Sequence, residues 1–148
     1  MQTIVKKFSE LTNYELYEIL KLRSSVFVVE QNCVYLDADS VDLDAYHVYI
    51  KDGDEIVAYL RVIDKGARLE EVSIGRVISL RRREGLGTKI MLEGIKVAKE
   101  KFGAKVIKIG AQAYAVPFYE QVGFKKIENG EYIEDGQPHV YMLYKDWI

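Results

Sequence analysis

A basic, glycine-rich loop is the segment of the chain best suited to binding a phosphate group. It reads Arg81-Arg-Arg-Glu-Gly-Leu-Gly87 and lies between a predicted strand and a predicted helix. Backbone N–H groups at such a helix start are open to an anion, and the helix dipole adds positive potential there. A dinucleotide fingerprint or a P-loop would need glycine at position 90, where the chain has Ile90. The loop therefore predicts an anion site of another kind, and the alternative is a surface turn with solvated arginines.

Arg23 interrupts a stripe of apolar side chains on the first predicted helix. The apolar residues of this stripe are Leu16, Ile19, Leu20 and Phe27. Together with Arg23 they follow the spacing of three and four positions that marks one face of a helix. A buried arginine needs an anionic partner, and either Glu30 or the acidic segment 37–44 could supply it. One interpretation is a substrate pocket that contains Arg23. The other is an arginine whose charged end reaches solvent at the edge of the stripe.

Composition excludes several classes of protein. The chain has 148 residues, 49% of them hydrophobic and 30% charged, with a net charge of -2. This balance argues against a polycation that coats nucleic acid, and no apolar stretch approaches the ~20 residues of a membrane span. Cys33 is the single cysteine, which fits a reducing compartment. We therefore expect one domain over residues 1–148, a cytoplasmic location, and no nucleic-acid or membrane partner.

Hydrophobic periodicity predicts the order strand, helix, three strands, helix, strand, helix and two strands. The three consecutive strands indicate an antiparallel meander, and the later strand–helix–strand units favour parallel pairing. Thr12 and Glu15 form a capping-box pattern before the first helix, and Gly103 is suited to end the second. The predicted strands cover residues 3–8, 45–51, 55–63, 70–80, 105–109, 124–127 and 139–143, the later helices cover 88–102 and 113–121, and turns are expected at Asp52-Gly53, Asn129-Gly130 and Asp135-Gly136.

Two motifs in the second half of the chain carry a family resemblance. The first is Arg82-x-x-Gly85-x-Gly87, and the second is the segment from Gln112 to Phe124. In this order, separated by a helix and a strand, they resemble the acyl-CoA motifs of the GNAT superfamily of N-acetyltransferases. Within the second motif the matching residues are Ala115, Tyr119, Gly123 and Phe124, and Gln112 stands where the family usually has asparagine.

Segments outside these motifs are similar to the ElaA-like branch of the family. They are Leu22-Arg23-x-x-Val26-Phe27-Val28-Val29-Glu30-Gln31-x-Cys33, Gly75-Arg76-Val77, and Glu134-Asp135-Gly136-x-Pro138-His139. With them the resemblance covers nearly the whole chain.

The resemblance implies an α/β fold of the GNAT type, with helices on both faces of a central mixed sheet. Its fourth and fifth strands, near residues 70–80 and 105–109, would splay apart to hold acetyl-CoA. No metal is expected, and Cys33, His47 and His139 lack the spacing of a zinc site. The coenzyme-binding residues that the resemblance implies are Val77, Ile78, Ser79, Arg81, Arg82, Arg83, Glu84, Gly85, Leu86, Gly87, Thr88, Gln112, Phe118 and Tyr119.

The reaction implied by the resemblance is direct transfer of an acetyl group from acetyl-CoA to a primary amine in a ternary complex. Backbone N–H groups near residues 77–80 would stabilise the negative charge on the thioester oxygen. Tyr119 would protonate the leaving thiolate, since a phenol stays protonated at neutral pH; the alternative is that its ring only packs. Two rival functions are a non-catalytic acyl-CoA-binding or sensing module, and an acyltransferase that uses a longer acyl-CoA, as acyl-homoserine-lactone synthases do.

The general base has several candidates. His139 is preferred, because histidine is the natural base near neutral pH. His47 and a chain of water molecules are alternatives, and so are the carboxylates of Glu30, Glu134 and Asp135.

The acceptor pocket is expected where Arg23, Glu30 and His139 converge near the acetyl group. Such a pocket would bind an acceptor that carries both an amine and an acidic group. The alternative is that Arg23 and Glu30 form a buried pair away from the acetyl group. The expected acceptor is a small-molecule or peptide amine, and the sequence leaves a homodimer open.

Overall fold

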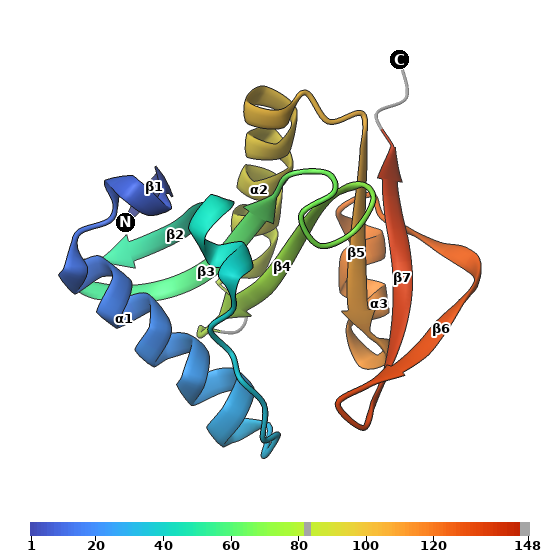
Figure 1. Ribbon diagram of the computed structural model, residues 1–148, viewed down its shortest axis with the longest axis horizontal. Coiled ribbons are helices and arrows are strands. Elements are labelled where there is room, and N and C mark those ends of the chain that lie inside the picture. Colours follow the sequence, from blue (N-terminus) through green and yellow to red (C-terminus); the bar gives the residue numbers. More distant parts are fainter. Residues whose placement is uncertain (82–83, 146–148) are drawn as a thin grey trace.

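The computed structural model describes residues 1–81 and 84–145, and a seven-stranded mixed sheet runs through it (Figure 1). The strand order is β1-β2-β3-β4-β5-β7-β6, and every neighbouring pair is antiparallel except β4 and β5. The strands are β1 (Gln2–Lys7), β2 (Tyr46–Asp52), β3 (Glu55–Ile63), β4 (Val72–Ser79), β5 (Val106–Gln112), β6 (Lys125–Glu134) and β7 (Gln137–Lys145), and the helices are α1 (Asn13–Arg23), α2 (Leu86–Phe102) and α3 (Val116–Gln121). The predicted order of elements and the mixed α/β architecture are confirmed.

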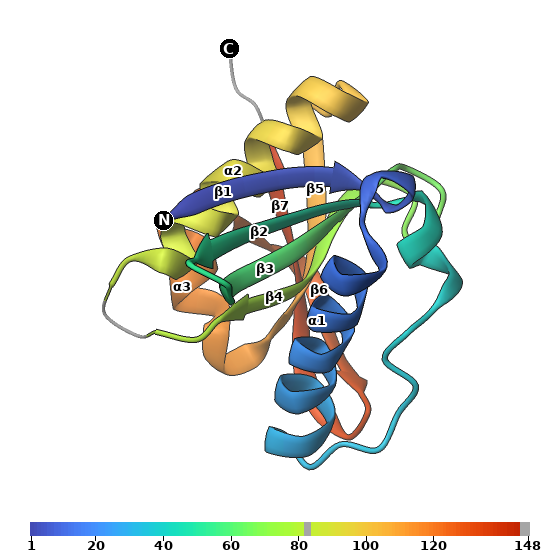
Figure 2. The same cartoon turned by 90° about the vertical axis from the view of Figure 1, so that its left-hand side faces the viewer.

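Helices α1 and α2 cover opposite faces of the β1–β4 part of the sheet (Figure 2). Ile90 and Met91 of α2 are fully buried in the larger core cluster, together with Leu60 of β3. Ile19 of α1 packs in a smaller cluster with Tyr59 on the other face. Burying one such side chain stabilises the fold by about 1.5–3 kcal/mol, so both faces of this half-sheet contribute to a rigid support. Among the described residues, no helix combines the length and hydrophobicity of a transmembrane span.

The first helix begins as the sequence predicts and ends differently. The Glu15 N–H donates to Thr12 Oγ1 at 3.1 Å, and the Thr12 N–H donates to Glu15 Oε1 at 2.8 Å, which completes the capping box. After Arg23 the chain continues as a π-helical segment, η2 (Ser24–Glu30). Such wider turns are rare and frequently occur at functional sites.

The sheet opens between β4 and β5, as the resemblance implies. The two strands pair only at Val72 with Ile107 and Ser73 with Lys108, and they diverge beyond these residues (Figure 1). After Ser73, the edge of β4 that faces β5 is therefore not paired with it.

Strand β4 also contains a bulge at the start of this opening. Tyr59 of β3 pairs with Ile78, and Arg61 pairs with Gly75, so β4 has one more residue than β3 between these pairs. Arg76 lies inside the bulge with φ +53°, in the left-handed region.

One turn prediction is wrong. Asn129-Gly130 lies inside β6, where Lys126 pairs with Met142 and Glu131 pairs with Val140, so the strand bulges and continues. Asn129 has φ +57°, a conformation that serves a bulge as well as a turn. The other two predicted turns, Asp52-Gly53 and Asp135-Gly136, are confirmed.

Candidate active site

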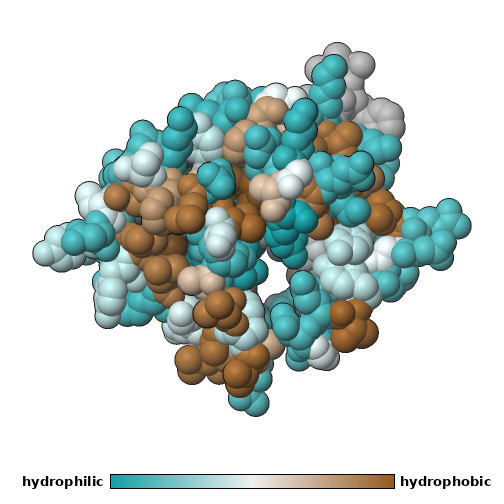
Figure 3. Space-filling view, in the orientation of Figure 1, coloured by the Kyte–Doolittle hydropathy of each residue, from teal (hydrophilic) through white to brown (hydrophobic). Residues whose placement is uncertain are grey.

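A cavity of about 700 Å³ occupies the space between the diverging strands. Figure 3 shows the surface hollowed between the α1 side and the β6–β7 side of the molecule. On the β4 side its wall is formed by the bulged stretch and the residues after it, namely Gly75, Arg76, Val77, Ile78, Ser79 and Leu80. On the other side it is formed by residues of β5, α3 and β7, among them Gly110, Gln112, Tyr119 and His139. The predicted residues Val77, Ile78, Ser79, Gln112, Tyr119, Glu30 and His139 thus line one cavity.

The predicted anion loop begins directly after this β4 wall and leads into α2. Gly85 has φ +72° and is the N-cap residue, so α2 begins at Leu86. The Leu86 side chain is buried in the core, which leaves only its backbone available to a ligand. Arg82 and Arg83 lie outside the described residues, while Glu84 and Thr88 are exposed on either side of the helix start.

Gly87 places the start of α2 against α3. A Cβ atom at position 87 would lie 3.3 Å from the Phe118 ring, so a larger side chain would displace this contact.

Arg81 pairs with Asp52 at 2.6 Å, and this hydrogen bond raises the pKa of the Arg81 guanidinium. Part of the positive charge expected at the loop is therefore already compensated.

Tyr119 faces the cavity from α3. Its ring makes edge contacts with Phe118 and Phe124, at centroid distances of 5.1 and 6.2 Å. Burial raises the pKa of Tyr119 to about 12, so its hydroxyl is a hydrogen-bond donor throughout the neutral range.

Gln112, at the end of β5, stands where the family usually has asparagine. Its side-chain amide donates to Gln31 Oε1 at 3.2 Å. Since Gln31 follows η2, this bond connects the β5 side of the cavity to the α1 side.

The two histidines have different surroundings. His139 lines the cavity, and its Nδ1 lies 2.8 Å from the Gln137 carbonyl oxygen. A carbonyl oxygen only accepts, so Nδ1 carries the proton in the neutral ring and Nε2 has the free lone pair. Nε2 lies 3.9 Å from Glu134 Oε2, and the ring stacks on Tyr132 with centroids 5.3 Å apart.

His47 is buried away from the cavity. Its ring nitrogens lie 2.7 Å from the Tyr59 hydroxyl and 3.0 Å from the Asp42 carbonyl oxygen. Burial lowers the pKa of His47, which favours a neutral, hydrogen-bonded ring with a structural role.

Arg23 does not line the cavity, which corrects the predicted acceptor pocket. Its side chain is fully buried and pairs with Asp37 at 2.9 Å and with Asp42 at 2.7 Å, while Glu30 is not among its partners. The expected buried pair of Arg23 with Glu30 is also wrong. Of the two alternatives for the anion, the acidic segment supplies it, because Asp37 and Asp42 pair with Arg23 at the end of α1.

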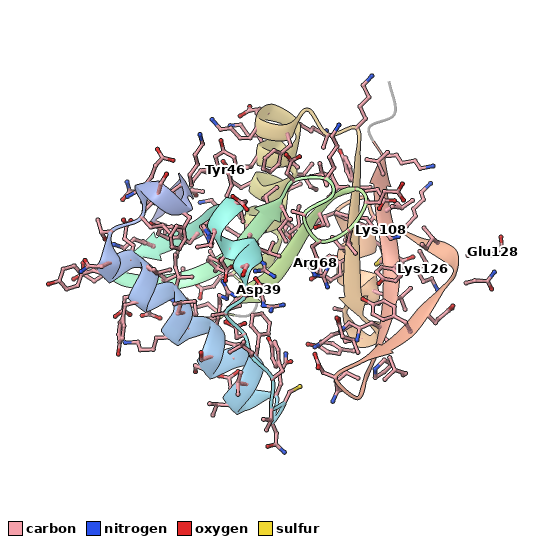
Figure 4. All side chains as sticks on the ribbon, in the orientation of Figure 1. Asp39, Tyr46, Arg68, Lys108, Lys126 and Glu128 are labelled. Atoms are coloured by element: carbon pink, nitrogen blue, oxygen red, sulfur yellow. The ribbon has the colours of Figure 1, made fainter. Side chains whose placement is uncertain are left out.

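These residues belong to a larger group, which we call the charge cluster: Arg23, Asp37, Asp39, Asp42, Arg61 and Arg76. Arg61 Nη1 lies 2.6 Å from Asp39 and 2.8 Å from Asp42, and Arg76 Nε lies 2.9 Å from Asp37. Three arginines thus balance three aspartates. Figure 4 shows Asp39 beside the short helix η3 (Ser40–Asp44) that follows it. The same view shows Arg68, another cavity residue, between β4 and β5.

The cluster contains functional candidates that the sequence analysis missed. Arg61 and Arg76 both line the cavity. A lone arginine inside the apolar run of β3 was the available signal for Arg61. Arg76 alternates with Ile74 and Ile78, a pattern typical of an uninterrupted strand. Among the described residues, no group of three or more histidine, cysteine or acidic side chains could hold a metal ion.

A sheet that opens between one parallel strand pair, with a glycine-capped helix directly after the first of those strands, defines the acyl-CoA N-acyltransferase class of fold. Comparison with known proteins agrees, since the acetyltransferase (GNAT) domain family matches residues 25–145. The chain belongs to this family, and the resemblance stated from its motifs is confirmed.

Individual relatives cover almost the whole chain. A UPF0039 protein of Schizosaccharomyces pombe is 40% identical over 146 residues, which cover 96% of this chain and 95% of that protein. The protein ElaA of Escherichia coli is 41% identical over 138 residues, 90% of each chain, and its crystal structure matches with a TM-score of 0.89 over 97% of this chain and 99% of that chain. The crystal structure of an acyl-CoA N-acyltransferase from Pseudomonas aeruginosa, 34% identical, has a TM-score of 0.89 with the same coverage.

Proposed function

We propose that the chain is an enzyme that moves an acetyl group from acetyl-CoA to a primary amine by direct transfer in a ternary complex. The observation that carries this proposal is that Tyr119, His139 and the unpaired side of β4 line the same cavity. The reaction needs a proton donor, a proton acceptor and a site for negative charge, and this cavity offers a candidate for each. We further propose that residues 1–148 act as one catalytic domain in the cytoplasm.

The coenzyme would enter between β4 and β5 with its diphosphate at the start of α2. Backbone N–H groups of residues 85–88 are suited to the phosphates because they lie at the N-terminus of α2, a helix of 17 residues. Arg81 and the neighbouring Arg82 and Arg83 would add charge, Phe118 and Tyr119 would contact the pantetheine side, and Gln112 would supply an amide. No metal is needed in this scheme.

The thioester would lie against the β4 bulge. Val77 lies in the bulge and Ile78 follows it, on the stretch of β4 that lacks β5 pairing. The backbone of this stretch is therefore the candidate oxyanion site. When the amine attacks the carbonyl carbon, negative charge develops on the carbonyl oxygen, and preorganised N–H donors stabilise it.

Tyr119 would act as the general acid. Because burial raises its pKa to about 12, it remains protonated and can donate to the sulfur as the C–S bond breaks. The phenolate then regains its proton from solvent, which leaves CoA as the free thiol.

His139 would act as the general base through Nε2. The lone pair on this atom follows from the Nδ1 contact with Gln137, and Glu134 beside Nε2 stabilises the imidazolium that forms. The proton lost by the attacking nitrogen goes to Nε2, and the products are an amide and CoA.

The acceptor would be a small-molecule or peptide amine that enters from the open end of the cavity. Glu30, Glu134 and Asp135 line this end, and their negative charge attracts an ammonium group before it loses its proton.

The proposal is tested by incubating the full chain with acetyl-CoA and a panel of amines and measuring free thiol and acetylated product. We expect thiol release that depends on one class of amine. Tight acetyl-CoA binding without turnover on any amine would favour a sensing module, and turnover only with longer acyl-CoA donors would favour the other rival.

A further inference from the structure

Arg76 has an unusual backbone conformation for its residue type. Among the described residues, the non-glycine residues with positive φ are Asn32, Arg76, Asn129 and Asp135. Asparagine and aspartate tolerate this region because their short polar side chains bond locally, whereas longer side chains are disfavoured. Some other interaction must therefore hold Arg76 in the left-handed region.

The Arg76 side chain makes a two-point contact with one residue. Its Nε donates to Asp37 Oδ1 at 2.9 Å, and its Nη2 donates to the Asp37 carbonyl oxygen at 3.1 Å. A planar guanidinium that binds both a carboxylate and a carbonyl of the same residue fixes direction as well as distance. The contact therefore constrains the backbone from which the arginine projects.

Asp37 is itself immobilised from the opposite side. Arg23 Nε donates to Asp37 Oδ2 at 2.9 Å, and Arg23 Nη2 donates to the Asp37 carbonyl oxygen at 3.0 Å. The Asp37 side chain is 5% exposed and that of Arg23 is 0% exposed. Arg23 also binds Asp42, which in turn binds Arg61 of β3. The charge cluster thus connects α1 and β3 to the β4 bulge through charges that have little room to move.

We propose that Arg76 is a positioning residue, whose paired contact with Asp37 holds the β4 bulge so that the backbone N–H groups after it face the acyl group. This inference rests on the proposed function, because it assigns the bulge a part in acyl transfer. In this account Arg76 acts through the backbone of Val77 and Ile78. Arg23 in turn holds Asp37 in place, which explains why an arginine interrupts the apolar stripe of α1.

The competing explanation is that Arg76 binds the acceptor directly, since its side chain is 19% exposed and lines the cavity. Two substitutions separate these roles. Arg76→Ala removes the contact with Asp37 and keeps the penalty of positive φ. Arg76→Gly removes the contact and the penalty together, because glycine adopts this conformation freely.

The experiment measures kcat and the KM for acetyl-CoA with a reactive amine, and it records 1H–15N spectra of the amides of Gly75 to Ile78. For Arg76→Ala we expect kcat to fall roughly 5- to 30-fold, the factor that corresponds to the left-handed penalty, with shifted β4 amides. For Arg76→Gly we expect the β4 amides near their wild-type positions and most of kcat recovered. Asn129→Ala is the matched control, because it carries the same penalty in the β6 bulge, outside the cavity. It should leave kcat and the β4 amides unchanged.

An equal loss of kcat in both Arg76 variants with the β4 amides in place would overturn the proposal and make Arg76 an acceptor-binding residue. Unchanged kcat and amides in Arg76→Ala would also overturn it. If the alanine variant does not fold, Arg76→Gly still decides, since loss of kcat with unshifted amides contradicts a positioning role. If the wild-type chain transfers no acetyl group, the proposed function fails, and the amide comparison alone still tests whether the contact holds the bulge.

Discussion

The cavity has two walls that use charged and titratable residues in opposite ways. On the β4 wall, Arg76 belongs to the charge cluster, whose members Arg61 and Asp42 are 1% and 7% exposed at their side chains. On the β5–β7 wall, Tyr119 and His139 face the cavity with few polar partners. A group that is fully paired is held in place, whereas a group with a free lone pair or proton can react. In the proposed function, the β4 wall would therefore position the substrate and the β5–β7 wall would exchange protons with it.

The largest expected effect comes from the proposed coenzyme site, at Gly87 of α2, which packs against Phe118 of α3. Gly87→Glu places bulk against the Phe118 ring, 3.3 Å from the Cβ position, and negative charge at a helix start proposed to bind phosphates. We expect acetyl-CoA binding to be lost in isothermal titration calorimetry. Leu92→Glu is the control, since it adds the same charge to an exposed position of α2 away from its start. Unchanged affinity in a folded Gly87→Glu protein would exclude this coenzyme site.

The next effect sharpens the structural role of the β4 wall. Arg23→Met leaves Asp37 and Asp42 buried without one of their partners, and breaking a buried pair in this way costs about 3–5 kcal/mol. Chemical denaturation measures the free energy of unfolding. Lys21→Met, on the exposed side of α1 in a surface pair, should change it by less than about 0.5 kcal/mol. A similar small change in Arg23→Met would show that the network contributes little.

The two histidines provide a matched pair, because His139 lines the cavity and His47 is buried away from it. For His139→Gln we expect kcat to fall by roughly 10²-fold, because the base is gone. For His47→Gln we expect kcat to stay close to that of the wild type and the free energy of unfolding to fall by about 1–3 kcal/mol, since two buried hydrogen bonds are disturbed. A loss of kcat of this size in His47→Gln rather than in His139→Gln would contradict the assignment of His139 as the base.

The smallest effect concerns acid stability. Burial alone would raise the pKa of Asp42, but hydrogen bonds and charge from Arg23 and Arg61 outweigh it and lower that pKa. A carboxyl whose pKa is lower in the folded state stabilises the fold above its unfolded pKa of about 3.9, and this contribution is lost as the pH falls through the folded value. Thermal unfolding should therefore show Tm falling below about pH 4 more steeply in the wild type than in Asp42→Asn. Parallel slopes would contradict the ion-pair account.

Local rules predicted most of the fold, and the family resemblance implied the opening of the sheet. Both failed where partners come from distant segments. The periodicity near Val72 to Ile78 identified β4, but an alternating pattern contains no sign of the bulge that turns Arg76 into the left-handed region. Asn129-Gly130 satisfies turn and bulge chemistry equally, and only pairing with β7 selects the bulge.

Charge was harder to predict than hydrophobicity. A segment as acidic as residues 37–44 is usually a solvated loop, yet Asp37 and Asp42 are only 6% and 5% exposed as whole residues. Their burial depends on arginines from α1, β3 and β4, and no local pattern records which carboxylate each arginine meets. For the same reason Arg23 could be recognised as anomalous from its own helix, while its place outside the cavity could not.

The most direct test of the account is the rate of acetyl transfer in Tyr119→Phe, which keeps the ring packed against Phe118 and Phe124 and removes only the hydroxyl. With chemistry shown to be rate-limiting, we predict that kcat falls by about 10²–10⁴-fold, the usual contribution of a positioned acid, while the Kd for acetyl-CoA stays close to that of the wild type. Tyr17→Phe, on the exposed face of α1, is the matched control and should keep full activity. A kcat of Tyr119→Phe within about twofold of the wild type would contradict the account and leave Tyr119 with a packing role only.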